Sequence, residues 1–189
     1  DFPVDTLRAS VSPAVQRPEW MIGQPRRTLH PDPVSIDEAV EVLWSAKRPL
    51  VISGRGAKGA GSELVQLLDA LDAVYLDTGE SRGLVPDSHP AVVAAVRGAV
   101  MGEADVVLTV GRKLDFQLAY GSPAVFGQAK FVRVADSLAE LRDNRRGEAE
   151  VLASPAMALQ ALVARANGRA PATDKEWKRS TRAKHQARA

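Results

Sequence analysis

Cysteine is absent from the 189-residue sequence, and histidine and aromatic residues are scarce. A chain without cysteine forms no disulfide bond and no thiolate metal site, which favours a reducing compartment and predicts a cytoplasmic protein. The three histidines, His30, His89 and His185, are far apart in sequence, so they show no zinc-ligand spacing. Because aromatic residues make up only 5% of the chain, we expect a core of Val, Leu and Ala.

Long apolar runs are also missing. The run from Ala104 to Val110 is broken by Asp105 and is much shorter than the about 20 residues that a membrane-spanning helix needs. We therefore predict a soluble protein with no membrane partner. The chain opens with Asp1 rather than Met and has neither a basic region nor an apolar signal core there, which suggests a cut inside a longer polypeptide.

Positive charge is concentrated at the carboxyl end. Residues 174–189 hold six Lys or Arg and two acids, a net charge of +4, whereas the whole chain carries +2, which leaves −2 for the rest. The basic pI therefore reflects mainly a tail, and a nucleic-acid partner is not expected.

Short β-branched runs alternate with segments of helical apolar spacing. Expected strands cover residues 50–53, 73–77, 105–110, 130–134 and 150–152. Expected helices cover residues 35–46, 63–71, 90–101, 138–143 and 155–166, with a further helix near Leu114. The first is expected to begin at Ser35, where Ser-Ile-Asp-Glu has the pattern of a capping box. This alternation predicts an α/β, Rossmann-like fold: a doubly wound parallel sheet of about five to six strands with helices on both faces.

Domain boundaries follow from composition. Residues 1–34 are rich in proline and are expected to be an extended interdomain linker with a remnant of a preceding domain. Residues 35–168 form the expected domain, and residues 169–189 the expected basic tail towards a missing following domain.

Four loops follow the carboxyl ends of strands, and these ends meet at one edge of a parallel sheet, where ligands bind. The loops cover residues 54–61, 78–83, 111–116 and 135–137. Gly54, Arg55 and Gly56 lead towards a helix amino end, where free N–H groups suit a phosphate; a tight turn that needs glycine for backbone reasons explains them equally well.

For the basic and acidic residues on the same loops, the sequence allows two roles each, one in ligand binding and one without a ligand. Arg55, Arg82, Arg112 and Lys113 would bring positive charge to a diphosphate, or would simply be solvated. Asp115 is a ribose or cation partner, or a helix cap.

Asp136 would bind a ribose hydroxyl, or would stabilise a polar turn. The sequence contains no nucleophile elbow, Walker loop, metal cluster or persuasive carboxylate pair, so we predict no catalytic and no metal-binding residue. His89 is more simply explained by a turn before a helix than by catalysis.

Several segments, in order, resemble the central domain of thiamine-diphosphate-dependent enzymes. They are Ala46 to Ile52, Gly54-x-Gly56-Ala57, Arg82 to Pro90, Ala104 to Gly111 and Lys130 to Val132. The oxalyl-CoA decarboxylase and 2-hydroxyacyl-CoA lyase branch is the most similar, with acetolactate synthase as a broader relative, and Phe2 to Asp5 resembles the last strand of a preceding domain.

The resemblance implies a three-domain parent enzyme, a homodimer or homotetramer, whose other two domains bind thiamine diphosphate and magnesium. In this family the central domain holds FAD, ADP or no nucleotide. Carried over by position, the residues expected to face a nucleotide are Gly54, Arg55, Gly56, Gly111, Arg112, Lys113 and Asp136.

Two positions depart from the family pattern. Gly111-Arg112-Lys113 replaces Gly-Ala-Arg, and Ala135 stands where an Asp usually follows the fourth strand, with Asp136 one residue later. A shift of one residue can turn a side chain to the opposite face.

Three hypotheses follow for function. The first is a structural, nucleotide-holding or empty central domain of a thiamine-diphosphate-dependent lyase, decarboxylase or synthase, inert alone. The second is a free-standing NAD- or nucleotide-dependent enzyme of Rossmann type, with Asp69, Asp72 or Asp77 as the ribose-binding acid. The third is an interaction domain.

Overall fold

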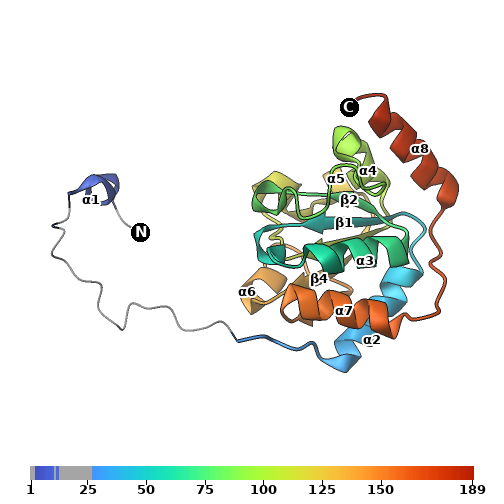
Figure 1. Ribbon diagram of the computed structural model, residues 1–189, viewed down its shortest axis with the longest axis horizontal. Coiled ribbons are helices and arrows are strands. Elements are labelled where there is room, and N and C mark those ends of the chain that lie inside the picture. The colour runs from blue at the N-terminus through green and yellow to red at the C-terminus, as the bar shows by residue number, and fades with distance from the viewer. Residues whose placement is uncertain (1–2, 11, 13–26) are drawn as a thin grey trace.

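The computed structural model describes residues 3–10, 12 and 27–189. Five parallel strands form one sheet in the order β2-β1-β3-β4-β5, with helices on both faces (Figure 1). The strands are β1 (Pro49–Ser53), β2 (Val74–Leu76), β3 (Val106–Val110), β4 (Lys130–Ala135) and β5 (Ala149–Leu152). The predicted fold class is confirmed, with five strands.

The helices are α1 (Val4–Arg8), α2 (Pro33–Trp44), α3 (Gly61–Leu71), α4 (Arg97–Glu103), α5 (Pro123–Phe126), α6 (Leu138–Leu141), α7 (Pro155–Arg165) and α8 (Lys175–Gln186). Among the described residues, helices α3 to α6 each lie between two consecutive strands of the chain, whereas α1 and α2 precede β1 and α7 and α8 follow β5. Short 3-10 turns occupy η2 (Arg55–Ala57), η3 (Gly79–Ser81), η4 (Ala94–Val96) and η5 (Phe116–Gly121).

Strand residues alternate between two hydrophobic clusters, one on each face of the sheet. In β1, Val51 packs with the cluster that contains α2, α3 and α7, whereas Leu50 and Ile52 pack with the cluster that contains α4 and α5. The register aligns Val51 with Leu108 of β3. Both faces are covered, which explains why the strands are continuously apolar rather than alternating with polar residues.

The first helix of the sheet domain begins earlier than expected. Asp32, not Ser35, is the N-cap, and its carboxylate accepts from the Ser35 backbone N–H at 2.9 Å. Pro33 occupies the first helical turn, where its fixed φ suits the helix and its missing N–H has no cost.

The helix expected over residues 90–101 begins only at Arg97. Val92 forms a parallel bridge with Tyr75, and the Tyr75 N–H donates to the Ala91 carbonyl at 2.7 Å. β2 is an edge strand with unpaired backbone groups on its outer side, and this extended segment pairs with them. The prediction of a helix from residue 90, which was based on apolar spacing, was therefore wrong for residues 90–96.

Half of the expected linker, residues 1–34, lies outside the described residues. Of the described part, Val4–Arg8 form helix α1, although Phe2 to Asp5 was expected to be a strand remnant, and Pro33 and Val34 belong to α2. A strand needs a neighbour for its backbone groups, and none of the five described strands pairs with residues 3–10.

Residues 169–189, expected as a basic tail, carry helix α8, which packs against η4. The Trp177 indole N–H donates to Glu103 at 2.8 Å, and Lys178 pairs with Asp72. Thr173 is buried, and its hydroxyl donates to the Leu71 carbonyl at 2.9 Å. Within the described residues, no helix combines the length and apolar character that a bilayer crossing requires.

These contacts predict that α8 stabilises the domain. Trp177→Ala removes apolar area from the cluster on the α4 face and the bond to Glu103, so we expect a loss of about 2 kcal/mol in the free energy of unfolding, measured by urea denaturation. Arg179→Ala, on the same helix but exposed, is the control and should cost under about 0.5 kcal/mol. Equal stability of the two variants would contradict a structural role for α8.

Candidate functional site

The loops that follow β1, β2, β3 and β4 meet at one edge of the sheet, as predicted. A groove at this edge is lined by Arg55 after β1, Glu80 after β2 and Asp136 after β4. An adjoining hollow of about 170 Å³ adds Arg112 after β3. The strand order reverses between β1 and β3, and this edge of such a sheet is where ligands bind.

We call the larger cavity the rim groove; its volume is about 530 Å³. It is lined by Arg55, Gly56, Lys58, Glu80, Asp136 and Glu140. Three of the seven predicted residues, Arg55, Gly56 and Asp136, therefore line one cavity. Lys113 lies next to it, because its ammonium is 3.9 Å from the carboxylate of Glu140.

The three predicted glycines, Gly54, Gly56 and Gly111, pack against one another where the loops after β1 and β3 touch. The N–H groups of Gly54 and Gly56 donate to the Val110 and Gly111 carbonyls at 3.0 and 2.9 Å. A Cβ on Gly56 would lie 2.8 Å from the Gly111 Cα, and Gly111 itself has a φ of +53°. This contact explains the need for glycine at these positions.

The expected phosphate cradle of backbone N–H groups is not formed by these glycines. The N–H group of Gly54 donates to Val110 of β3, that of Gly56 to Gly111 and that of Gly111 to Val134 of β4. The turn η2 also separates Gly54 from helix α3, which begins at Gly61. A phosphate in the rim groove would therefore be held by side chains.

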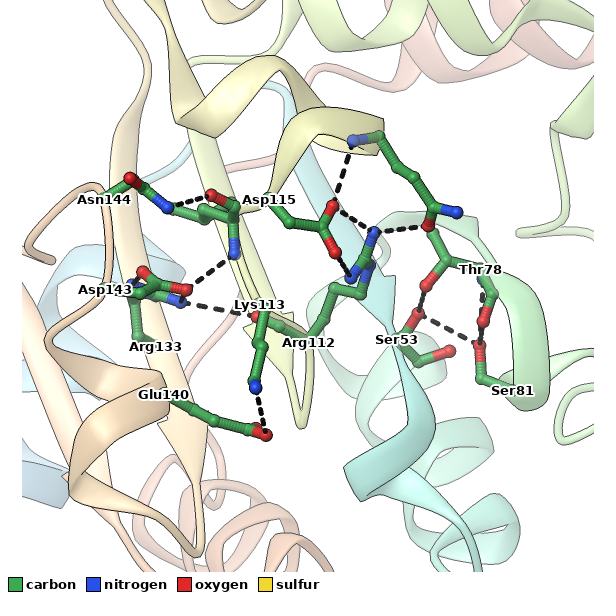
Figure 2. A network of polar contacts seen from close by, with 12 residues as sticks. Ser53, Thr78, Ser81, Arg112, Lys113, Asp115, Arg133, Glu140, Asp143 and Asn144 are labelled. Carbon is green, nitrogen blue, oxygen red and sulfur yellow. Dashed lines mark hydrogen bonds and ion pairs between the residues drawn. The ribbon is translucent and has the colours of Figure 1, made fainter. Parts of the chain in front are cut away.

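Arg112 faces away from the rim groove and lines only the adjoining hollow. Its guanidinium donates to both carboxylate oxygens of Asp115, at 2.8 and 2.9 Å, and to the Gln117 side chain at 2.8 Å (Figure 2). These hydrogen bonds hold the pKa of Asp115 below its usual value. Asp115 also caps the turn η5 by accepting from the Gln117 N–H, which confirms its expected role as a cap.

The Arg112 side chain is only 9% exposed, and its Nε is buried without an acceptor among the described residues. Gly54 is essential to this position, because a Cβ there would lie 2.6 Å from the Arg112 Cδ. The Arg112 guanidinium thus lies inside the loop, and Lys113 lies beside the groove.

Sequence reasoning missed the buried arginine of β4. Arg133 is 1% exposed; it pairs with Asp143 and donates to the carbonyls of Arg145 and Arg112, at 2.7 and 3.4 Å. Asp143 in turn accepts from the Leu114 N–H at 2.8 Å (Figure 2). One buried charge therefore fixes the loop after β3 and the segment between α6 and β5.

The signal for this pair was an arginine inside the apolar strand Lys130–Ala135. A buried charge requires a partner, and an acid from a following polar segment was the candidate. Its identity could not be read from spacing, because Asp136, Glu140 and Asp143 all follow within a few residues.

A second missed feature is a set of buried hydroxyl groups at the carboxyl ends of β1 and β2. The Ser53 and Tyr75 hydroxyls are hydrogen bonded at 2.5 Å, and the Thr78 and Ser81 hydroxyls donate to the Ser53 carbonyl at 2.6 and 3.0 Å. Burial raises the pKa of Tyr75 above its usual value, so the phenol stays protonated. These bonds fix the loop after β2 against β1.

His89 takes part in a turn, as expected: its Nδ1 accepts from the Ala91 N–H, and its Nε2 lies 3.3 Å from the Asp69 carboxylate. Asp72, another candidate for a ribose-binding acid, is the C-cap of α3 and pairs with Lys178. Only Asp77 of these three acids directly follows a strand. No group of three potential metal-ligating side chains occurs in residues 3–10, 12 and 27–189.

The Arg133–Asp143 pair predicts an asymmetric mutational response. Asp143→Ala leaves the guanidinium buried without a counter-charge, so we expect a loss of about 3–5 kcal/mol in the free energy of unfolding by urea denaturation. Combining Arg133→Met with Asp143→Ala should restore part of the lost free energy of unfolding, because the buried charge is then removed as well. As a control, Arg146→Ala removes a largely exposed partner of Glu150 and should cost under about 1 kcal/mol. A double variant less stable than Asp143→Ala alone would contradict this account.

The glycine contact predicts opposite outcomes for two Gly→Ala changes. Gly56→Ala brings a Cβ against the Gly111 backbone and should destabilise the domain by about 1–3 kcal/mol. Gly98→Ala, in α4 with no atom within 4 Å of the new Cβ, should stabilise it by about 0.5–1 kcal/mol. Chemical denaturation of both variants measures the difference, and a neutral Gly56→Ala would exclude close packing of the two loops.

Comparison with curated proteins gives relatives with three related activities. The chain is 30% identical over 145 residues to an oxalyl-CoA decarboxylase of Escherichia coli K12, a match that covers 76% of this chain and 26% of that protein. A 2-hydroxyacyl-CoA lyase of Arabidopsis thaliana is 32% identical over 150 residues, with coverage of 75% and 26%. An acetolactate synthase large subunit of Mycobacterium tuberculosis is 33% identical over 150 residues, with coverage of 77% and 26%. The chain thus spans about a quarter of the length of these relatives.

A solved structure supports the fold. It is described as a putative thiamin diphosphate-dependent enzyme from Mycobacterium smegmatis, and it matches with a TM-score of 0.62 at 16% identity, over 82% of this chain and 30% of that one. The family model for the central domain of thiamine pyrophosphate enzymes matches residues 36–162. The sheet order, the loops at its carboxyl edge and these matches lead to one conclusion: the chain belongs to the thiamine pyrophosphate enzyme central domain family.

Proposed function

We propose that this chain is the central domain of a three-domain thiamine-diphosphate-dependent decarboxylase, lyase or synthase, and that its rim groove holds an adenine nucleotide. The domain itself performs no step of the thiamine chemistry. The observation that carries the nucleotide proposal is that Arg55, Gly56 and Asp136, from two different loops, line one groove at the carboxyl edge of the sheet.

The groove has the size and the chemistry for such a ligand. Its volume of about 530 Å³ falls within the range of about 300–1,000 Å³ that is usual for small-molecule sites. Arg55 and Lys58 offer positive charge for phosphate groups. Asp136, immediately after β4, offers a carboxylate for ribose hydroxyls.

The acids in the groove do not prevent phosphate binding. Arg55 and Glu80 are 3.5 Å apart, with side chains that are 83% and 60% exposed, and Lys113 and Glu140 are separated by 3.9 Å. Exposed ion pairs of this kind contribute little free energy, about 0–1 kcal/mol. A phosphate group can therefore replace Glu80 or Glu140 as the partner of these cations at small cost.

The remaining functions belong to the rest of the parent enzyme in this proposal. Two flanking domains would bind thiamine diphosphate and magnesium, and the full-length enzyme would assemble as a homodimer or homotetramer in the cytoplasm. Thiamine diphosphate supplies the chemistry of carbon–carbon cleavage next to a carbonyl. This chain would contribute a rigid sheet and, in the rim groove, a nucleotide with a structural role.

Calorimetric titration of the chain with ADP and with FAD tests the nucleotide proposal. We expect saturable binding of one of them, weakened about tenfold by Asp136→Ala because a charged hydrogen-bond partner of the ribose is lost. The matched control is Asp87→Ala, an exposed acid that lies outside the rim groove and should leave the affinity unchanged. No binding of either nucleotide at millimolar concentration, or equal effects of the two variants, would contradict it.

The same titration with thiamine diphosphate and magnesium tests catalytic inertness. We expect that the chain alone gives no saturable heat of binding with thiamine diphosphate and magnesium. Tight binding of thiamine diphosphate to this domain would contradict the proposed division of roles between domains.

A further inference from the structure

A second cavity lies at the carboxyl end of β2 and shares no lining residue with the rim groove. Its volume is about 470 Å³, and we call it the Arg97 pocket. The polar side chains that line it are those of Asp77, Thr78, Arg82, Arg97 and Gln117. It opens between the loop after β2, which was expected at the ligand-binding edge, and the start of α4, which was not.

Arg97 is the central cation of this pocket. It is half-buried at the start of α4, and one guanidinium nitrogen donates to the Asp77 carbonyl at 3.2 Å. Burial lowers its pKa; the Asp77 carboxylate acts in the opposite direction, and the positive charges of Arg112 and Arg82 lower it further. Arg82 and Arg97 line the same pocket, so two guanidinium groups share it.

The charges around the pocket do not cancel. Arg112 is neutralised by its two bonds to Asp115, which leaves Asp77 to balance both Arg82 and Arg97. The Arg112 guanidinium also binds the side-chain oxygen of Gln117, so the amide nitrogen of Gln117 remains as a donor. The pocket thus combines a net positive charge with several N–H donors.

A partly desolvated arginine beside other arginines has an electrostatic cost unless an anion is bound. Guanidinium groups bind phosphate through paired N–H donors, and such charge-assisted bonds are stronger than neutral ones. The hydroxyl groups of Thr78 and Ser81 behind the pocket hold the loop after β2 in place, so the donors are positioned before a ligand arrives.

We propose that the Arg97 pocket is a phosphate-binding site, built by Arg97 and Arg82 at the carboxyl end of β2 and separate from the rim groove. It requires no nucleotide in the rim groove and is independent of the function proposed above. The phosphate is either the free ion or the monoester group of a larger ligand, since both present the same oxygens.

Inorganic phosphate is the probe, titrated into the full chain at constant ionic strength and followed by the chemical shifts of backbone amides. We expect saturable shifts centred on residues 77–82 and 97, with a dissociation constant on the order of 1 mM. Arg97→Gln and Arg82→Gln should each weaken binding at least about tenfold, because each removes a charged donor. The Arg82 side chain is exposed, so this second variant retains the fold even if Arg97→Gln does not.

Arg179→Gln is the matched control: an exposed arginine on α8, paired with Glu176, whose loss should leave phosphate binding unchanged. The proposal is overturned if shifts stay linear with concentration, or if Arg82→Gln and Arg179→Gln bind phosphate equally well. Methyl phosphate distinguishes the sources: tighter binding than the free ion assigns the site to a monoester, and weaker binding to the free ion.

Repeating the titration in the presence of saturating ADP separates the two sites. Retained phosphate binding supports a separate pocket, whether or not ADP itself binds in the rim groove. Competitive displacement by ADP would instead make the pocket a part of the nucleotide site and overturn the inference. Failure of ADP to bind at all would contradict only the function proposed for the rim groove.

Discussion

The arrangement of the loops after β3 and β4 depends on a single buried charge. Arg133 lies inside β4 with almost no exposed surface, and a guanidinium in such a position must be satisfied on all its donors. It obtains these partners from Asp143 and from backbone carbonyls of the loop after β3 and of the segment before β5. This one requirement therefore joins β4 to the loop after β3 and to the segment before β5, which form one part of the edge that carries the candidate sites.

The strands could be predicted well because their signal is local. Runs such as Val106–Val110 are mostly apolar and β-branched, and all five expected strands agree with the structure to within one residue at each end. The predicted ends of the helices agree less closely with the structure, because they depend on partners outside the helix. The segment from Ala91 to Val93 has helical apolar spacing, but it is extended in the structure because its backbone forms hydrogen bonds with the edge strand β2. Similarly, the composition of α8 predicted a charged tail, because the contact that holds it, between Trp177 and the cluster on the α4 face, is not visible in the sequence.

The site was predictable in outline only. Parallel topology placed the four loops together, and three expected residues share a groove, because that follows from the direction of the strands. The direction of each side chain does not follow from sequence. Arg112 turns towards Asp115, and the N–H groups of Gly54 and Gly56 donate to the carbonyls of Val110 and Gly111. The Arg97 pocket was missed because Arg97 belongs to helix α4, and no motif links it to Arg82 in the loop after β2.

The contact between the loops after β1 and β3 has a mechanical consequence. Gly56 and Gly111 leave no gap between two backbones, and hydrogen bonds join them, so neither loop can move far without displacing the other. Close-packed contacts transmit displacement rather than absorb it. A displacement of the loop that carries Arg55 would therefore also move the loop that carries Arg112. The two loops form one rigid surface at this edge of the sheet.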